Sequence, residues 1–168
     1  MRLASLVLLV GVTGASPVGA QVQVDPWEFG LGPHVVVRED STSHNGGSIT
    51  IARRFQRLAA VFEASGTRRE GHNDWRLVGG PRWMVNETSS TAVSVQVLMG
   101  TLIRSGEADW AVMPGAAFDV RLADSAAIRL QIDAPIERSA SYTASWFRDQ
   151  PEAVTAKSGR VSVLLVFN

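Results

Sequence analysis

The sequence predicts an all-β protein, an eight-stranded antiparallel up-and-down transmembrane β-barrel that follows a signal peptide. Three observations lead to this prediction. Apolar and polar residues alternate with a period of two along most of the chain, which is typical of strands. Eight such segments follow one another through turn-forming clusters, so neighbours can pair and the last can close on the first. Several segments span about 9 to 13 residues, enough for a tilted strand to cross a bilayer.

The first 20 residues form the predicted signal peptide. A positive start at Met1 and Arg2 precedes the apolar stretch LASLVLLVGV, and Val18 and Ala20 occupy the positions that a signal peptidase prefers. A buried N-terminal helix is the alternative. We therefore expect residues 1–20 to be removed on export and residues 21–168 to form one barrel domain in the bacterial outer membrane.

The predicted strands are separated by two kinds of connection. The runs RRFQR, NETSS and ADS contain short turns, whereas EDSTSHNGG, GTRREGHND and residues 138–158 are longer and more polar. Short turns at one end and longer loops at the other indicate an up-and-down meander. The eight predicted strands comprise residues 29–38, 48–55, 57–65, 75–85, 92–104, 109–122, 126–137 and 160–168.

Each predicted strand has one apolar face and one face that mixes small and charged residues. Alternation alone leaves open which face points inward. With the apolar face inside, the chain would be a soluble barrel with an apolar pocket. With that face outside, it would contact lipid, and the charged residues would fill the lumen. The clearest alternation sets Ile128, Leu130 and Ile132 against Arg129, Gln131 and Asp133.

The composition of the charged face favours an inward position. This face is rich in Gly, Ala and Ser, which suits a narrow interior filled by long arginines. Asp119 can pair with Arg121 or Arg129, and a second pair can join Glu63 to Arg82. Because eight strands leave an interior just wide enough for side chains, we expect a plugged polar lumen. Ordinary solvated charges on an exposed sheet face are the alternative. The expected network comprises Glu63, Arg76, Arg82, Asp119, Arg121, Arg129 and Asp133.

Aromatic residues at the ends of the predicted strands give a further reason to place the apolar face outward. In a membrane barrel, aromatic side chains form girdles at the two lipid–water interfaces. The girdle is thin here, because aromatic residues are only 7% of the chain. The expected girdle comprises Trp27, Trp75, Trp83, Trp110 and Phe167.

Three stretches resemble a known family. GGPRWMV at residues 79–85, PGAAFDVRLADSAAIRLQIDAP at 114–135 and RVSVLLVF at 160–167 are similar to the small outer-membrane β-barrels related to the OmpA transmembrane domain. The resemblance implies that Asp119, Arg121, Arg129 and Asp133 point into the barrel. It also implies two partners, namely outer-membrane lipid and the barrel assembly machinery, which reads the aromatic end of the last strand.

Signals for catalysis are weak. The chain has no glycine-rich phosphate loop, zinc pattern or nucleophile elbow, and it has no cysteine. Ser43 and His44 are adjacent, as a lipid-cleaving barrel could use them, but SHNGG is better interpreted as a hairpin loop in which Asn and Gly supply positive φ. We therefore expect no catalytic, cofactor-binding or metal-binding residue and no cofactor.

The function predicted from these features is that of an integral outer-membrane protein with a structural or surface-interaction role. Acidic and basic residues balance at 16 each, so we expect no nucleic acid partner, and a partner of the surface loops is not identified. Two alternatives stay open. The first is a soluble periplasmic ligand-binding barrel of lipocalin-like shape, and the second is a barrel enzyme that acts on lipid.

Overall fold

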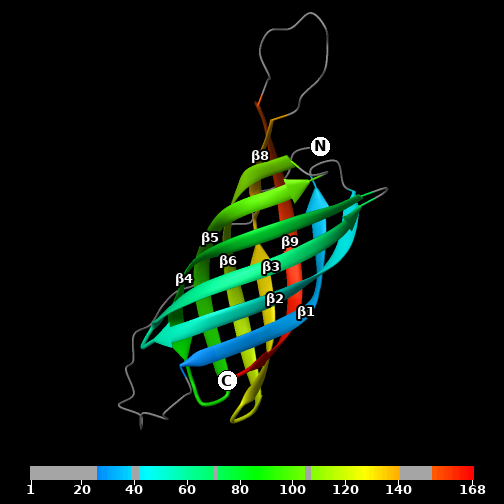
Figure 1. Cartoon of the computed structure of the whole chain (residues 1–168). Helices are drawn as coiled ribbons and strands as arrows, with labels where there is room; N and C mark the ends of the chain where they lie inside the picture. The colour runs from blue at the N-terminus through cyan, green and yellow to red at the C-terminus, as the bar shows by residue number, and fades with distance from the viewer. Residues whose placement is uncertain (1–25, 39–41, 70–71, 105–106, 141–152) are drawn as a thin grey trace, which may run out of the picture.

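The computed structural model describes residues 26–38, 42–69, 72–104, 107–140 and 153–168, so the predicted signal peptide lies outside the described residues. These residues form strands and no helix (Figure 1). The described residues contain no helix that is long and apolar enough to cross a membrane. The strands are β1 (Trp27–Arg38), β2 (Ser43–Phe55), β3 (Leu58–Arg69), β4 (His72–Glu87), β5 (Thr91–Arg104), β6 (Glu107–Ala123), β7 (Ala126–Asp133), β8 (Ile136–Ala140) and β9 (Ala153–Phe167).

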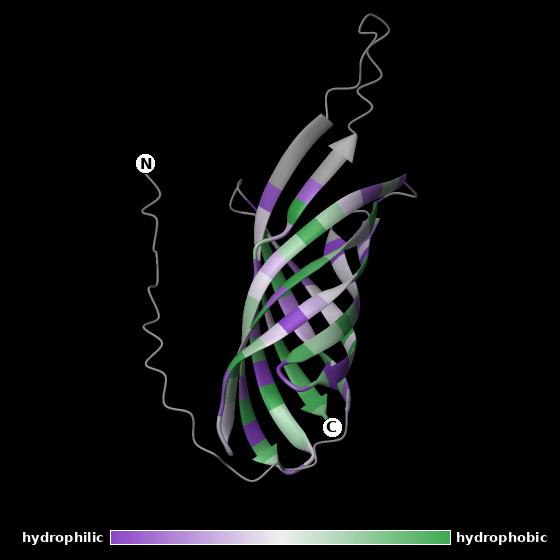
Figure 2. Cartoon of the chain, turned by 90° about the vertical axis from the view of Figure 1, so that its left-hand side faces the viewer, coloured by the Kyte–Doolittle hydropathy of each residue, from purple (hydrophilic) through white to green (hydrophobic). Residues whose placement is uncertain are grey.

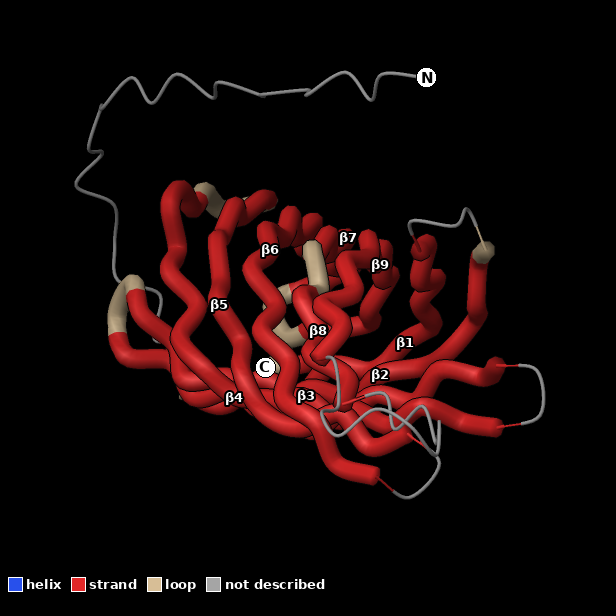
Figure 3. The backbone as a smooth tube through the Cα atoms, turned by 90° about the horizontal axis from the view of Figure 1, so that it is seen from above, coloured by secondary structure: helices blue, strands red, loops and turns tan. Residues whose placement is uncertain are grey.

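The strands close into an antiparallel barrel in which each strand, apart from β7 and β8, pairs with its neighbours in sequence. The last strand, β9, pairs with β1, with Phe167 opposite Phe29 and Val161 opposite Val35. Closure leaves neither β1 nor β9 as an open edge, and the view from above shows the strands arranged around the barrel (Figure 3). The predicted pairing of the last strand with the first is therefore confirmed.

The nine strand segments make eight barrel strands, because β7 and β8 lie end to end. Both pair with β6 on one side and with β9 on the other. The predicted strand 126–137 is thus interrupted at Ala134 and Pro135. Proline has no N–H to donate to a ladder, which explains the break. The backbone still crosses the gap, since Ala134 N donates to Pro114 O at 2.8 Å and Ser158 N to Pro135 O at 3.1 Å.

The three short turns lie at the end of the barrel that we call the turn end. Gln56 and Arg57 alone connect β2 to β3, because Phe55 and Leu58 are paired. Gln56 has a φ of 57° at the first central position, a conformation that two-residue hairpins use. Residues 88–90 join β4 to β5, and Asp124 and Ser125 join β6 to β7. The short connections predicted in RRFQR, NETSS and ADS are confirmed.

At the opposite end, which we call the far end, the strands are longer than predicted. Ser43 already begins β2, β3 continues to Arg69, and β4 begins at His72. The predicted strands ended too early because the outward side chains become polar near the far end, as at Asn45. The alternation of apolar and polar residues that marks a strand therefore disappears in this part of the sequence. Much of the three predicted polar loops is therefore paired strand.

Gly46 corrects the prediction that SHNGG is a loop with positive φ. It lies within β2, opposite His34 of β1 and Thr67 of β3. A Cβ atom at Gly46 would lie 2.2 Å from the carbonyl oxygen of Gly66 and 2.3 Å from Nε2 of His34. Glycine is required there by the close approach of its neighbours rather than by a turn.

Hydropathy alternates along the barrel strands (Figure 2), and the exposed fractions of the side chains show that the two faces of the wall have opposite polarity. Outward side chains are apolar and exposed, as shown by Ile49 at 62% and Met99 at 58%. The inward side chains of Arg129 and Arg160 have 0% exposure. Apolar side chains are also buried in the barrel, among them Leu164 and the cluster of Ala52, Ala59, Val61, Val78, Leu98 and Met113.

Candidate functional site

The barrel interior gathers the ionisable side chains and is the candidate functional site. Period-two alternation sends every second residue of each strand inward, so charged residues far apart in sequence meet around one axis. The four largest fully buried side chains are arginines. Isolated buried charges are very unfavourable, and such groups therefore require partners. The four are Arg76, Arg82, Arg129 and Arg160.

The central cluster joins three strands through Arg160 of β9. Arg160 Nη2 donates to Glu63 Oε2 at 2.9 Å and to Asp133 Oδ2 at 2.6 Å, and Nη1 donates to Glu63 Oε1. Two amides complete the cluster, because Gln131 Nε2 and Gln96 Nε2 donate to Asp133 at 2.9 and 3.0 Å. Glu63 belongs to β3, which does not adjoin β9, so this contact spans the lumen.

A second cluster, the turn-end cluster, lies closer to the short turns. Arg129 makes a bidentate contact with Asp119, with two donations of 2.7 Å. Its Nη1 also donates to Glu28 Oε1 at 2.5 Å. Arg82 Nη1 reaches the same oxygen at 2.5 Å. Glu28 therefore bridges two buried arginines from β4 and β7.

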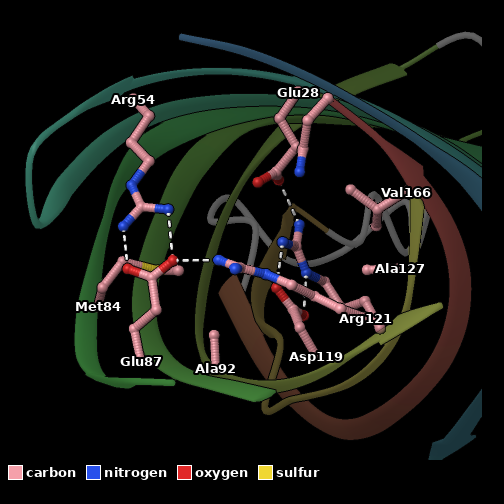
Figure 4. A pocket seen from close by; sticks show the side chains of 11 residues that line it. Glu28, Arg54, Met84, Glu87, Ala92, Asp119, Arg121, Ala127 and Val166 are labelled. Atoms are coloured by element: carbon pink, nitrogen blue, oxygen red, sulfur yellow. Dashed lines mark hydrogen bonds and ion pairs between the residues drawn. The ribbon is translucent and has the colours of Figure 1, made fainter. Parts of the chain in front are cut away.

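The rim cluster closes this end of the lumen and borders a pocket (Figure 4). Glu87 lies between Arg54 and Arg121. Arg54 Nη1 donates to Glu87 Oε1 at 2.9 Å, Nη2 donates to Oε2, and Arg121 Nη2 donates to Oε1 at 2.5 Å. The side chain of Arg121 is 24% exposed, so the rim cluster is more exposed to solvent than the turn-end cluster.

A fourth cluster, the far-end cluster, occupies the opposite part of the lumen. Arg76 donates to Glu137 Oε1 from Nε at 2.9 Å and from Nη2 at 2.6 Å. Arg104 bridges Glu137 at 3.1 Å and Asp74 at 3.2 Å. Arg38 also reaches Asp74, at 3.4 Å. The clusters thus extend from one end of the described barrel to the other.

The structure places all seven predicted lumen residues on the inward face. Six are buried, and Arg121 is at the rim. Of the two partners expected for Asp119, it contacts Arg129. The seven are Glu63, Arg76, Arg82, Asp119, Arg121, Arg129 and Asp133.

The expected pairing of Glu63 with Arg82 is wrong. Glu63 pairs with Arg160, and Arg82 pairs with Glu28. The register explains the difference, because Glu63 lies opposite Val78 while Arg82 lies opposite Ala59. Four residues along a strand are about 13 Å, which is too far for contact.

Eight charged members of the four clusters were missed by the sequence prediction, and each stands at or near the end of a predicted strand. They are Glu28, Arg38, Arg54, Asp74, Glu87, Arg104, Glu137 and Arg160. The position of each residue in the period-two alternation is the signal that could have found them. Arg160, for example, is separated by even steps along β9 from Ser162 and Leu164, whose side chains are also buried in the barrel.

The predicted aromatic girdle residues all lie on the outward face. Trp27, Trp83 and Phe167 are near the turn end, whereas Trp75 and Trp110 are near the far end. Their exposed fractions range from 41% for Phe167 to 54% for Trp75. The two groups thus bracket the apolar band of the barrel wall.

Ser43 and His44 do not form a catalytic pair in this structure. Both belong to β2, where successive side chains point to opposite faces. The imidazole of His44 contacts the hydroxyl of Thr42 at 3.4 Å. Within the described ranges, no group of three or more His, Cys, Asp or Glu residues is arranged to hold a metal ion.

The central cluster leads to a stability prediction. Replacing Arg160 with Met leaves Glu63 and Asp133 without their shared cation in a buried site, so we expect a loss of about 3–5 kcal/mol in the free energy of unfolding. Adding Glu63→Gln removes one stranded charge and should restore part of the loss. Urea unfolding of the reconstituted protein, followed by tryptophan fluorescence, measures both effects.

The control for this prediction is Arg121→Met. Arg121 is partly exposed and leaves Glu87 paired with Arg54, so we expect a loss of about 1 kcal/mol or less. An Arg160→Met variant no less stable than Arg121→Met would contradict the role assigned to the central cluster.

No family model matches the sequence, and the search of curated proteins gives no match. Several solved structures are similar to the structure of this chain. The crystal structure of Neisserial surface protein A (NspA) gives a TM-score of 0.54 at 6% identity, over 84% of this chain and 94% of that chain. The crystal structure of Ail, the attachment invasion locus protein of Yersinia pestis, gives a TM-score of 0.41 at 12% identity, over 84% of this chain and 96% of that chain. The crystal structure of Ail in complex with the heparin analogue sucrose octasulfate gives a TM-score of 0.42 at 13% identity, over 84% of this chain and 96% of that chain.

The similarity to NspA, at 6% identity, concerns the fold alone. It confirms the expected fold class and the resemblance to small outer-membrane barrels at that level. This chain has the fold of an eight-stranded, all-antiparallel transmembrane β-barrel.

Proposed function

We propose that this chain is an integral outer-membrane protein with a structural or surface-interaction role and a plugged polar lumen. One observation carries the proposal, namely the inverted polarity of the wall. Large apolar side chains such as Leu31, Ile49 and Ile132 are more than half exposed, whereas four arginines are fully buried. Soluble monomers rarely expose apolar patches larger than a few hundred Å².

Closure of the barrel supports the same proposal. In the hydrocarbon of a bilayer every backbone polar group requires an internal partner, which helices and closed barrels provide. The pairing of β9 with β1 meets this requirement. The aromatic residues that bracket the apolar band then lie at the two interfaces. Short turns face the periplasm in such barrels, so the turn end is the periplasmic end.

The lipocalin-like alternative requires an apolar pocket inside the barrel. The interior instead holds ion pairs such as Arg160 with Asp133 at 2.6 Å and Arg76 with Glu137 at 2.6 Å. The enzyme alternative is also disfavoured, because Ser43 and His44 are successive residues of one strand and point apart.

The proposed partners are the lipids of the membrane and the barrel assembly machinery. The apolar outward rows supply the surface for lipid. For the assembly machinery, the feature that supports the proposal is the aromatic end of β9, where Phe167 is outward and 41% exposed.

The location is tested by fractionation of expressing cells. We expect the protein in the outer-membrane fraction, and we expect the unboiled protein to migrate differently from the boiled protein in detergent gels, because a closed barrel keeps its compact fold. The control is a chain refolded after boiling, which should regain the first mobility. Recovery in the soluble periplasmic fraction would contradict the proposal.

The plugged lumen is tested by conductance across a planar bilayer. Because the four clusters occupy the interior along its length, we expect no discrete conductance steps from the inserted protein. Insertion is verified on the same preparation by its mobility before boiling. Reproducible steps from the native chain would show an open path and overturn this part of the proposal.

A further inference from the structure

Arg53 is a charged residue on the outward face of the wall. It lies in β2, in a row with Ile49, Ile51 and Phe55, and it is exposed. The outward rows of β1, β5 and β7 contain no charged side chain. If the outward face contacts lipid, as the proposed function requires, a guanidinium placed there needs a reason.

Two aromatic rings hold the Arg53 side chain. Its guanidinium carbon lies 5.4 Å from the ring centre of Trp27 and 5.3 Å from that of Phe55. Both distances are within the range of cation–π attraction. Trp27 is the cross-strand partner of Arg53 in β1, and Phe55 is two residues along the same strand. The ladder therefore fixes the cation beside both rings.

Among the residues that the structure describes, no carboxylate forms an ion pair with Arg53. Its neighbour Arg54, by contrast, turns inward and pairs with Glu87. Cross-strand, Arg53 faces Trp27 on one side and Ala60 on the other. The guanidinium thus keeps donors for a ligand outside the barrel wall.

The position of Arg53 fits the interface of a membrane. It is two residues from the end of β2, about 7 Å along the strand, at the turn end with the aromatic girdle. Arg side chains at such depths bring the charged head to the interface while the stem stays on apolar surface. Toward the membrane centre, Phe29, Ile51 and Phe62 form a continuous paired row of exposed apolar side chains.

We propose that Arg53, flanked by Trp27 and Phe55, binds the phosphate group of an anionic phospholipid in the periplasmic leaflet. This inference rests on the proposed function. The planar guanidinium can donate two parallel hydrogen bonds to phosphate oxygens, and the apolar row accommodates the acyl chains. Anionic lipid is selected because the site offers a cation, and no carboxylate of the described residues pairs with it to attract an ammonium headgroup.

The experiment measures lipids retained by the full mature chain released from nanodiscs that contain phosphatidylglycerol and phosphatidylcholine, using native mass spectrometry. The native chain should retain phosphatidylglycerol preferentially. Arg53→Gln should weaken that retention about tenfold, because it removes a charge-assisted contact. Arg53→Lys, which keeps the charge without the planar fork, should be intermediate.

The matched control is Arg57→Gln. Arg57 is an exposed arginine in the turn after β2, so the variant loses the same charge at the same end. It should retain phosphatidylglycerol like the native chain. Equal retention by the native chain and Arg53→Gln, or an equal loss in Arg57→Gln, would overturn the lipid site.

The same preparation separates this inference from the proposed function. A chain that enters nanodiscs and shifts on boiling, but prefers neither lipid, refutes the lipid site and leaves the membrane role intact. A native chain that does not enter nanodiscs refutes both.

Discussion

The contact of Arg160 with Glu63 and Asp133 shows the constraint on which the barrel depends. Three strands contribute these groups, and all three side chains are buried. Removing charges from water is unfavourable, and mutual attraction offsets this only when the geometry is good and every partner is present. Compared with an apolar interior of the same volume, the network adds little to the free energy of unfolding, yet the loss of one member leaves a buried charge without its partner. All members must therefore be in place together, which fixes the positions of distant strands relative to one another.

The outer face follows from the same constraint. When polar groups take the inside of a narrow barrel, period-two alternation places apolar groups outside. The result is a wall suited to lipid, with aromatic residues where the band ends. Arg53 is an exception on this wall, and its two aromatic neighbours at 5.4 and 5.3 Å account for its placement at the band's edge. The fold, the polar lumen and the proposed contact with lipid therefore follow from the same alternation of side chains along the strands.

The sequence was sufficient to predict the strands and their faces, because the polar interior and the apolar exterior of the barrel impose an alternation of polar and apolar residues on each strand. It was not sufficient for the pairs across the lumen. Glu63 and Arg160 are 97 residues apart, and their contact depends on strand tilt and stagger, which alternation does not encode. The extension of β2 to Ser43 was also missed, since its outward row is polar there and only backbone pairing marks it as strand. Gly46 was assigned to a turn because composition cannot distinguish positive φ from close approach.

The most direct test concerns which medium the outward face contacts. The chain has no native cysteine, so single cysteines at Val95, Val97 and Met99 of β5 can carry a nitroxide label. Asp124, in the exposed β6–β7 turn, is the control. In reconstituted vesicles, the three β5 labels should collide more with oxygen than with a water-soluble nickel chelate, and the Asp124 label should show the reverse. Nickel-accessible labels at all three β5 positions would contradict a lipid-facing wall.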